Sequence, residues 1–230
     1  MPTDYTYILV LIGLVISLIA SANVKFTFHR YAKVANARGL TGRDVARMIL
    51  EHEGIDDVEI KRISGSLTDH YSPNELVLRL SDSVYDSTSV AAIGVAAHEC
   101  GHAIQHKENY GPLKLRSLSV PLANIGSWLS WPLIVLGIIF DFLGLAQIGV
   151  ILFTFVVLFQ LITLPVEFDA SKRAMYVLET GGILEGEEIS GAGKVLKAAA
   201  LTYVAALLTS ILQLLRLVLI VGGIGGRRRD

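Results

Sequence analysis

The chain has 230 residues, of which 52% are hydrophobic and only 18% are charged, and its mean hydropathy is +0.54. Soluble domains carry about a quarter charged residues, so the composition disfavours an ordinary soluble enzyme and excludes a disordered chain. The net charge of −1 argues against a basic nucleic-acid binder, and the single cysteine, Cys100, allows no internal disulfide. The class that remains is a membrane protein with some soluble mass.

Four apolar runs are each long enough to cross a bilayer as a helix, which takes roughly 20 residues. They are 5–22, 118–140, 143–165 and 198–221. The fourth run contains Gln213 and Arg216, so the sequence leaves open whether it spans the membrane, is re-entrant or lies along the membrane surface. The first run ends in Ala-Ser-Ala, which resembles a cleavage site, but its leading residues contain Asp4 and no base. We therefore expect an uncleaved anchor, because signal peptides begin with a basic region.

The distribution of lysine and arginine predicts the orientation of the chain, because cytoplasmic loops are enriched in both. Basic residues follow the first run, precede the second and follow the third, whereas the turn between the second and third contains Asp141 and no base. This pattern predicts that the N-terminus lies outside and that segments 24–117 and 166–197 lie inside. Arg227–Arg229 conflict with this orientation if the fourth run spans the membrane.

The polar segments predict a small α+β arrangement. Thr41 and Asp44 have the spacing of a capping box and begin an amphipathic helix. A second helix runs from Thr88 through Gln105, with its cap at residues 86–87. The amphipathic helix covers 40–54. Strands are expected at 58–63 and 76–80, with a turn at 72–74, and a loop or weak short helix is expected at 181–193.

The second of these helices contains the motif His-Glu-x-x-His at His98, Glu99 and His102. Four residues advance a helix by about 400° and 6 Å, so both imidazoles lie on one face and can bind one metal ion. Glu99 can accept a proton from an attacking water. The alternative, a polar patch on a core helix, is disfavoured because burying these groups without partners is costly. Cys100 points away from this face and is expected to be a small buried side chain.

A hydrolytic metal site needs a third ligand that leaves one position open for water. Glu167 is the preferred candidate, because two membrane crossings separate it from His102 and place both residues on the same side. Asp169 is the alternative ligand, and its other possible role is to accept a hydrogen bond from a histidine ligand.

Two further groups could support the site. His106 lies about 12 Å along the helix from His98, which is too far to share the ion, so we expect a supporting or surface role. Asp69, His70 and Tyr71 form a polar cluster before the second strand. They are either a turn or a group that stabilises the transition state or orients a ligand.

Four segments together resemble the YugP-type bacterial membrane zinc metallopeptidases: 67–71, 96–105, 164–170 and 199–205. The resemblance implies a multi-pass membrane protein with a zincin-type catalytic domain. The wider pattern is similar to the HtpX and CAAX-prenyl type-I proteases, in which the histidine motif pairs with a later E-x-x-x-D. By this resemblance Glu167 takes the glutamate position. Ser171 stands where the pattern has aspartate, and Asp169 is the candidate substitute.

The sequence thus predicts a mainly α membrane protein with about four transmembrane or membrane-associated helices. A small zincin-like α+β catalytic domain with a short sheet is expected in 24–117 and 166–197. We expect a Zn²⁺-dependent endopeptidase of the bacterial cytoplasmic membrane, with its active site at the cytoplasmic face and no nucleic-acid partner. Its peptide or membrane-protein substrate would add to an edge strand at 76–80.

Two other functions are weighed against this one. A pseudo-protease or membrane scaffold with a structural zinc is the main alternative, and an intact Glu99 argues against it, because a structural site needs no general base. A transporter ranks last, because the apolar runs contain few charges that could form an ion pathway. The natural substrate and the oligomeric state are left open.

Overall fold

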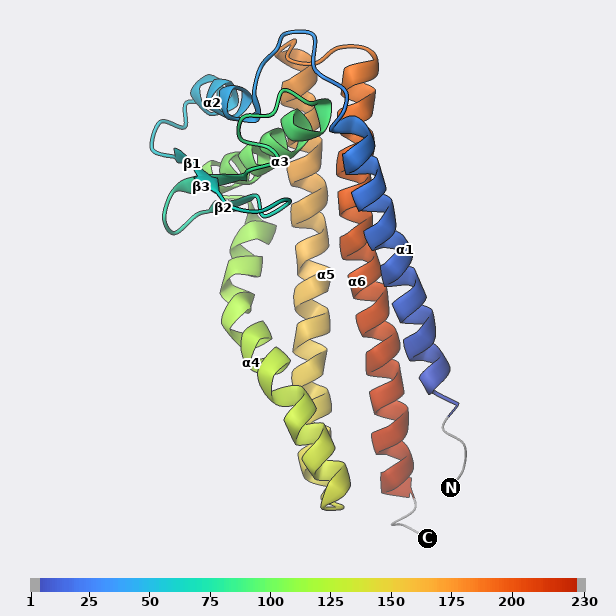
Figure 1. Cartoon of the computed structure of the whole chain (residues 1–230). Helices are drawn as coiled ribbons and strands as arrows, with labels where there is room; N and C mark the ends of the chain where they lie inside the picture. The colour runs from blue at the N-terminus through green and yellow to red at the C-terminus, as the bar shows by residue number, and fades with distance from the viewer. Residues whose placement is uncertain (1–4, 227–230) are drawn as a thin grey trace. The chain divides into compact units, whose positions relative to one another are not determined.

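The computed structural model describes residues 5–226, and the side chains of residues 5–223. Asp4 and Arg227–Arg229 therefore lie outside the described residues. The described fold is mainly helical with a small sheet, which confirms the predicted fold class (Figure 1). In chain order the elements are α1 (Tyr7–Tyr31), α2 (Gly42–His52), β1 (Glu59–Ile63), β2 (His70–Ser72), β3 (Val77–Ser81), α3 (Val90–Lys107), α4 (Gly111–Ile139), α5 (Leu143–Thr180) and α6 (Glu187–Gly226).

The chain divides into two compact units. The first, here called the helical unit, comprises the chain through Ala20, Lys114–Leu164 and the chain from Thr202 onward. The second, here called the mixed unit, comprises Ser21–Leu113 and Pro165–Leu201 and contains the whole sheet. Each unit has a separate cluster of buried apolar side chains.

Among the described residues, four helices are long and apolar enough to cross a membrane: α1, α4, α5 and α6. At most 28% of the most apolar window of each helix is buried, so most of these side chains face outward, as lipid-facing residues do. Within the helical unit, small residues allow close packing: a Cβ on Gly137 would lie 2.4 Å from the Ala146 nitrogen. Ser17 and Thr209 join α1 and α6 by a hydroxyl–hydroxyl hydrogen bond of 2.9 Å.

Two helices continue further than the sequence pattern predicts. Helix α5 does not end near Pro165 but runs on to Thr180, so Glu167 lies within a helix and its position is fixed by that helix. Helix α6 begins at Glu187, so the loop expected at 181–193 is found only at 181–186, and 187–193 belong to a long helix. Gly191 near its start allows close packing, because a Cβ at this position would lie 2.8 Å from the ring of Tyr31.

The mixed unit is built around α2, α3 and the sheet. As predicted, Thr41 caps α2 in a capping box with Asp44, whose backbone N–H donates to the Thr41 hydroxyl at 3.1 Å. The cap of α3 is Ser89, three residues beyond the predicted start of the cap, and its hydroxyl accepts the Ala92 N–H. Apolar side chains of α2, β3, α3 and the parts of α5 and α6 that belong to this unit form the core, and α3 is buried along most of its length.

The sheet has the order β1-β3-β2, with β1 parallel and β2 antiparallel to β3. The residues around His70 form a strand, which excludes the turn, one of the two alternatives left open for them. The expectation that the strand at 76–80 lies at an edge is wrong, because β3 is central. Asp69 explains the strand at His70, because its carboxylate accepts the backbone N–H of Ser81 at 2.7 Å and the Ser81 hydroxyl at 2.9 Å. These bonds hold the start of β2 against the end of β3.

Gly101 marks the closest approach of α3 to α5. A Cβ at this position would lie 2.4 Å from the carbonyl oxygen of Ala170, which is far inside van der Waals contact. We expect Gly101→Ala to force the two helices apart and to destabilise the protein by about 1–3 kcal/mol. Thermal unfolding of the purified protein measures the effect. Gly111→Ala is the control, because nothing lies within 4 Å of a Cβ there, and an equal drop in Tm for both variants would contradict the packing argument.

Candidate metal centre

Helix α3 and helix α5 bring three potential metal ligands together in the mixed unit. His98, His102 and Glu167 each offer one ligand atom, and these atoms all lie within 4.8 Å of one another. The Glu167 Oε2 atom lies 3.3 Å from His98 Nε2 and 3.7 Å from His102 Nε2. The close approach of the helices at Gly101, one residue before His102, allows the carboxylate to reach both imidazoles.

The geometry and burial of this group fit a metal ion. A tetrahedral zinc with bonds of about 2.0–2.1 Å separates its ligand atoms by about 3.3–3.4 Å, close to the separations of Glu167 Oε2 from the two imidazoles. Glu167 is only 3% exposed, and its Oε2 atom has no hydrogen-bond partner among the described residues. A buried carboxylate oxygen without a donor is costly, and a bound cation would remove that cost.

The second nitrogen of each imidazole is held by another side chain. His98 Nδ1 lies 3.1 Å from the hydroxyl of Ser171, and His102 Nδ1 lies 3.0 Å from Gln105 Oε1. Both Nε2 atoms are therefore directed towards Glu167. Such contacts fix the orientation of histidine ligands in metal sites.

The hydrogen bonds of Gln105 determine the tautomer of His102. Gln105 is fully buried, and its Nε2 donates to the carbonyl of Val166 and to Asp169 Oδ2, both at 2.8 Å. Because both partners can only accept, the amide oxygen must face His102, and His102 Nδ1 must carry a proton. The lone pair is then on Nε2, which is the form that binds a metal. Asp169 is held in turn by Arg173 Nε at 2.6 Å.

The electrostatics of the site favour a positive charge. Burial lowers the pKa of His102, but the neighbouring carboxylates of Glu167 and Glu99 outweigh burial and leave that pKa raised. Glu99 itself is 7% exposed and lies on the same helix between the two histidines. Two carboxylates around a pair of imidazoles thus attract a cation.

The side chains in contact with the two histidines differ in part from those that the sequence suggested. Asp169 reaches His102 only through Gln105, which sequence reasoning included in a motif without assigning it a role. The sequence signal for this contact is the position of Gln105, three residues after His102 on the same helix. Ser171, noted as a departure from the family pattern, places its hydroxyl on His98.

His70, Tyr71 and His106 are not part of the three-residue group. His70 Nδ1 lies 2.9 Å from the carbonyl oxygen of Thr68. The Tyr71 hydroxyl lies 2.8 Å from His106 Nδ1, which joins β2 to the end of α3. A role for these residues in catalysis remains a prediction.

Cys100 is fully buried, and its Sγ lies 3.7 Å from the carbonyl oxygen of Ala46. Burial raises the pKa of this thiol above its usual range, so the thiolate that would bind a metal is disfavoured. We expect Cys100→Ala to retain bound metal and activity. Elemental analysis of the purified variant beside His102→Ala measures this, and loss of metal from Cys100→Ala would show that the sulfur is a ligand.

Comparison with known proteins agrees with the geometry. A family model described as "Putative neutral zinc metallopeptidase" matches residues 6–222. The chain is 47% identical over 212 residues to "Putative membrane protease YugP" of Bacillus subtilis (strain 168), covering 92% of this chain and 94% of that protein. No solved structure matches the chain significantly.

Proposed function

The chain belongs to the neutral zinc metallopeptidase family, and we propose that it is a membrane-embedded zinc endopeptidase that cleaves peptides or membrane proteins. The observation that carries the proposal is the convergence of His98, His102 and Glu167 within 4.8 Å, with a buried Glu167 oxygen that lacks a donor. Two histidines and one carboxylate leave the fourth position of a tetrahedral ion open for water or substrate.

In this proposal His98, His102 and Glu167 hold the zinc, and Glu99 is the general base. When bound, zinc polarises the scissile carbonyl and makes an attacking water more acidic. Glu99 accepts a proton from the water while the oxygen of the water bonds to the carbonyl carbon. The same carboxylic acid then gives the proton to the leaving amine as the C–N bond breaks, so that Glu99 ends the cycle ionised.

The residues around the ligands keep them ready for this chemistry. Gln105 holds His102 in the tautomer with its Nε2 lone pair available, and Asp169 holds Gln105. The hydroxyl of Ser171 makes the corresponding contact with Nδ1 of His98. Side chains in such positions change metal affinity or activity by about 10–100-fold when they are removed.

The sheet offers an edge for an extended substrate. Strand β2 pairs with β3 on one side, and among the described strands it has no partner on the other. Tyr71 of β2 is hydrogen-bonded to His106 of α3, so this edge lies beside the helix that carries Glu99. A peptide added to β2, in place of the edge first expected at 76–80, would gain backbone hydrogen bonds next to the proposed base.

The proposed setting is the bacterial cytoplasmic membrane, with catalysis at the cytoplasmic face. Four candidate membrane-spanning helices support a multi-pass arrangement. The concentration of lysine and arginine in 24–117 and 166–197 supports a cytoplasmic position for the proposed catalytic segments.

Comparison of membrane peptides from cells that produce the wild-type protein or Glu99→Gln tests this function. Uncut substrates are expected to accumulate only in Glu99→Gln, because glutamine keeps the shape of glutamate but cannot accept the proton. Cys100→Ala, a change of the next residue on α3, is the matched control. Identical peptide profiles for all three proteins would favour a scaffold with a structural zinc.

A further inference from the structure

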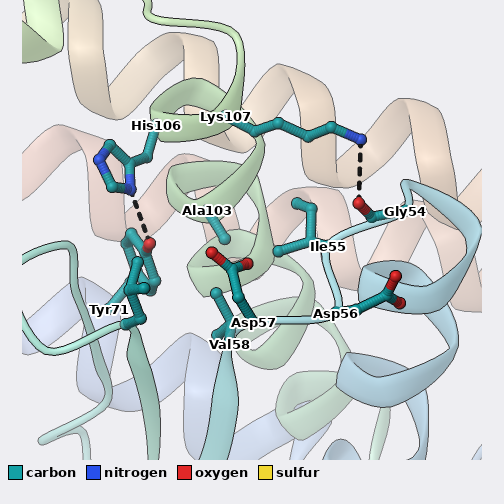
Figure 2. A pocket seen from close by; sticks show the side chains of 10 residues that line it. Gly54, Ile55, Asp56, Asp57, Val58, Tyr71, Ala103, His106 and Lys107 are labelled. Atoms are coloured by element: carbon teal, nitrogen blue, oxygen red, sulfur yellow. Dashed lines mark hydrogen bonds between the residues drawn. The ribbon is translucent and has the colours of Figure 1, made fainter.

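A pocket of about 400 Å³ opens in the mixed unit between the end of α3, strand β2 and the 54–58 segment that follows α2 (Figure 2). Its walls come from elements that share the core of this unit. The metal centre described above does not use this pocket, and none of the metal ligands lines it.

The pocket lies on the flank of α3 that carries the proposed base. Ala103 and His106 line it, and they follow Glu99 by four and seven residues. Side chains at this spacing share one face of a helix. The opposite flank of α3 is closed by α5, which contacts Gly101. A substrate bound across Glu99 would therefore extend towards the pocket and not towards α5.

The lining combines an apolar floor with a carboxylate. Ile55, Val58 and Ala103 supply apolar surface. In Figure 2 the carboxylate of Asp57, an exposed residue, points between Tyr71 and Ile55, whereas the side chain of Asp56 points away. A long side chain with a polar end could lie against the floor and reach Asp57.

The charges around the pocket leave Asp57 as the group that faces its interior. Lys107 also lines the pocket, but its Nζ donates to the carbonyl oxygens of Glu53 and Gly54, away from Asp57 (Figure 2). Burial raises the pKa of Tyr71 to about 12, and the negative charge of Asp57 adds to the effect. Tyr71 thus stays neutral and able to donate to His106, while Asp57 supplies a negative potential.

We propose that this pocket receives a lysine or arginine side chain of the substrate close to the scissile bond, with Asp57 binding the cationic end. This inference rests on the proposed peptidase function and adds a substrate class to it. The methylene groups of the side chain would cover Ile55, Val58 and Ala103, and the charged end would form a charge-assisted hydrogen bond with Asp57. Pairing of the peptide with β2 would set which residue enters the pocket.

The test uses the full-length protein with bound zinc in detergent micelles. A library of peptides from a chymotryptic digest of a cell proteome, which retains internal basic and acidic residues, is cleaved, and mass spectrometry identifies the residues that flank each cut. Wild type is expected to prefer lysine or arginine at one fixed position. The preference is measured on two peptides that differ only in lysine or norleucine at that position, as kcat/KM for the lysine peptide divided by kcat/KM for the norleucine peptide. Asp57→Asn should lower this quotient by about tenfold, since it removes the charge but keeps the shape.

Two variants complete the design. Asp57→Lys should shift the preference towards glutamate or aspartate at the same position, because the sign of the potential is reversed. Glu59→Gln removes an exposed negative charge of β1, whose partner is Lys61, and should leave the preference unchanged. These changes are read as ratios between peptides, so a general loss of folded protein does not imitate them.

The possible results separate this inference from the proposed function. If wild type cleaves peptides and Glu99→Gln does not, the peptidase function holds. The proposed role of the pocket is then contradicted if the cut positions show no preference for lysine or arginine. It is also contradicted if Asp57→Asn keeps the full preference of the wild type. If wild type cuts no peptide of the library, or if Glu99→Gln cuts as fast as wild type, the mechanism proposed above is wrong and the proposed role of the pocket falls with it.

Discussion

Replacement of Glu167 by alanine is expected to remove zinc from the purified protein and to abolish peptide hydrolysis. Its carboxylate is the group that approaches both imidazoles, at 3.3 and 3.7 Å, and it is held in place by helix α5. Two histidines alone would leave the ion with half of a tetrahedral ligand set. Asp169→Ala should cost less, about 10–100-fold in affinity or activity, because Asp169 acts on His102 through Gln105.

Elemental analysis and a competition assay with a chelator measure these effects. Glu179→Ala is the matched control, because it removes an exposed carboxylate from the same helix. If Asp169→Ala loses the metal and Glu167→Ala retains it fully, Asp169 is the third ligand and Glu167 has the supporting role. Retention of zinc in both variants would require another third ligand, and His106 would then have to leave its contact with Tyr71.

Glu99→Gln is expected to keep one zinc per chain and to lose nearly all turnover. The residue lies between the two histidines, is mostly buried, and is not one of the three converging ligands. A positioned general base accelerates the reaction by about 10²–10⁴-fold, and the amide of glutamine cannot accept the proton. The loss should appear in kcat, since the variant still binds metal and substrate.

Zinc content and steady-state kinetics on one peptide, measured for the same preparation, check this prediction. Turnover near the wild-type rate would place the base elsewhere. Loss of zinc from Glu99→Gln would instead assign Glu99 a structural role at the site.

The histidine motif and the capping box of α2 could be predicted from sequence because both depend on local spacing. His98 and His102 share a face on any helix, and Thr41 and Asp44 bond to each other within one turn. The long apolar runs were equally clear, because the need to satisfy backbone groups in lipid leaves few alternatives to a helix.

Features that depend on contacts between distant residues could not be predicted in the same way. The strand at His70 forms because Asp69 bonds to Ser81, twelve residues away, and this makes β3 central. Pro165 suggested an end to the third helix, yet α5 continues through it. The hydrogen bonds of Gln105 to α5 were also invisible, since no periodicity records which helix lies opposite.

X-ray absorption at the zinc edge of the purified wild-type protein tests the central claim most directly, because it reports both the presence of zinc and the identity of its ligands. The proposed site predicts one zinc per chain, with two imidazoles and oxygen ligands at about 2.0–2.2 Å. A sulfur ligand at about 2.3 Å, which only Cys100 or a methionine could supply, would contradict the site. Protein that remains free of zinc after incubation with the metal would contradict it as well.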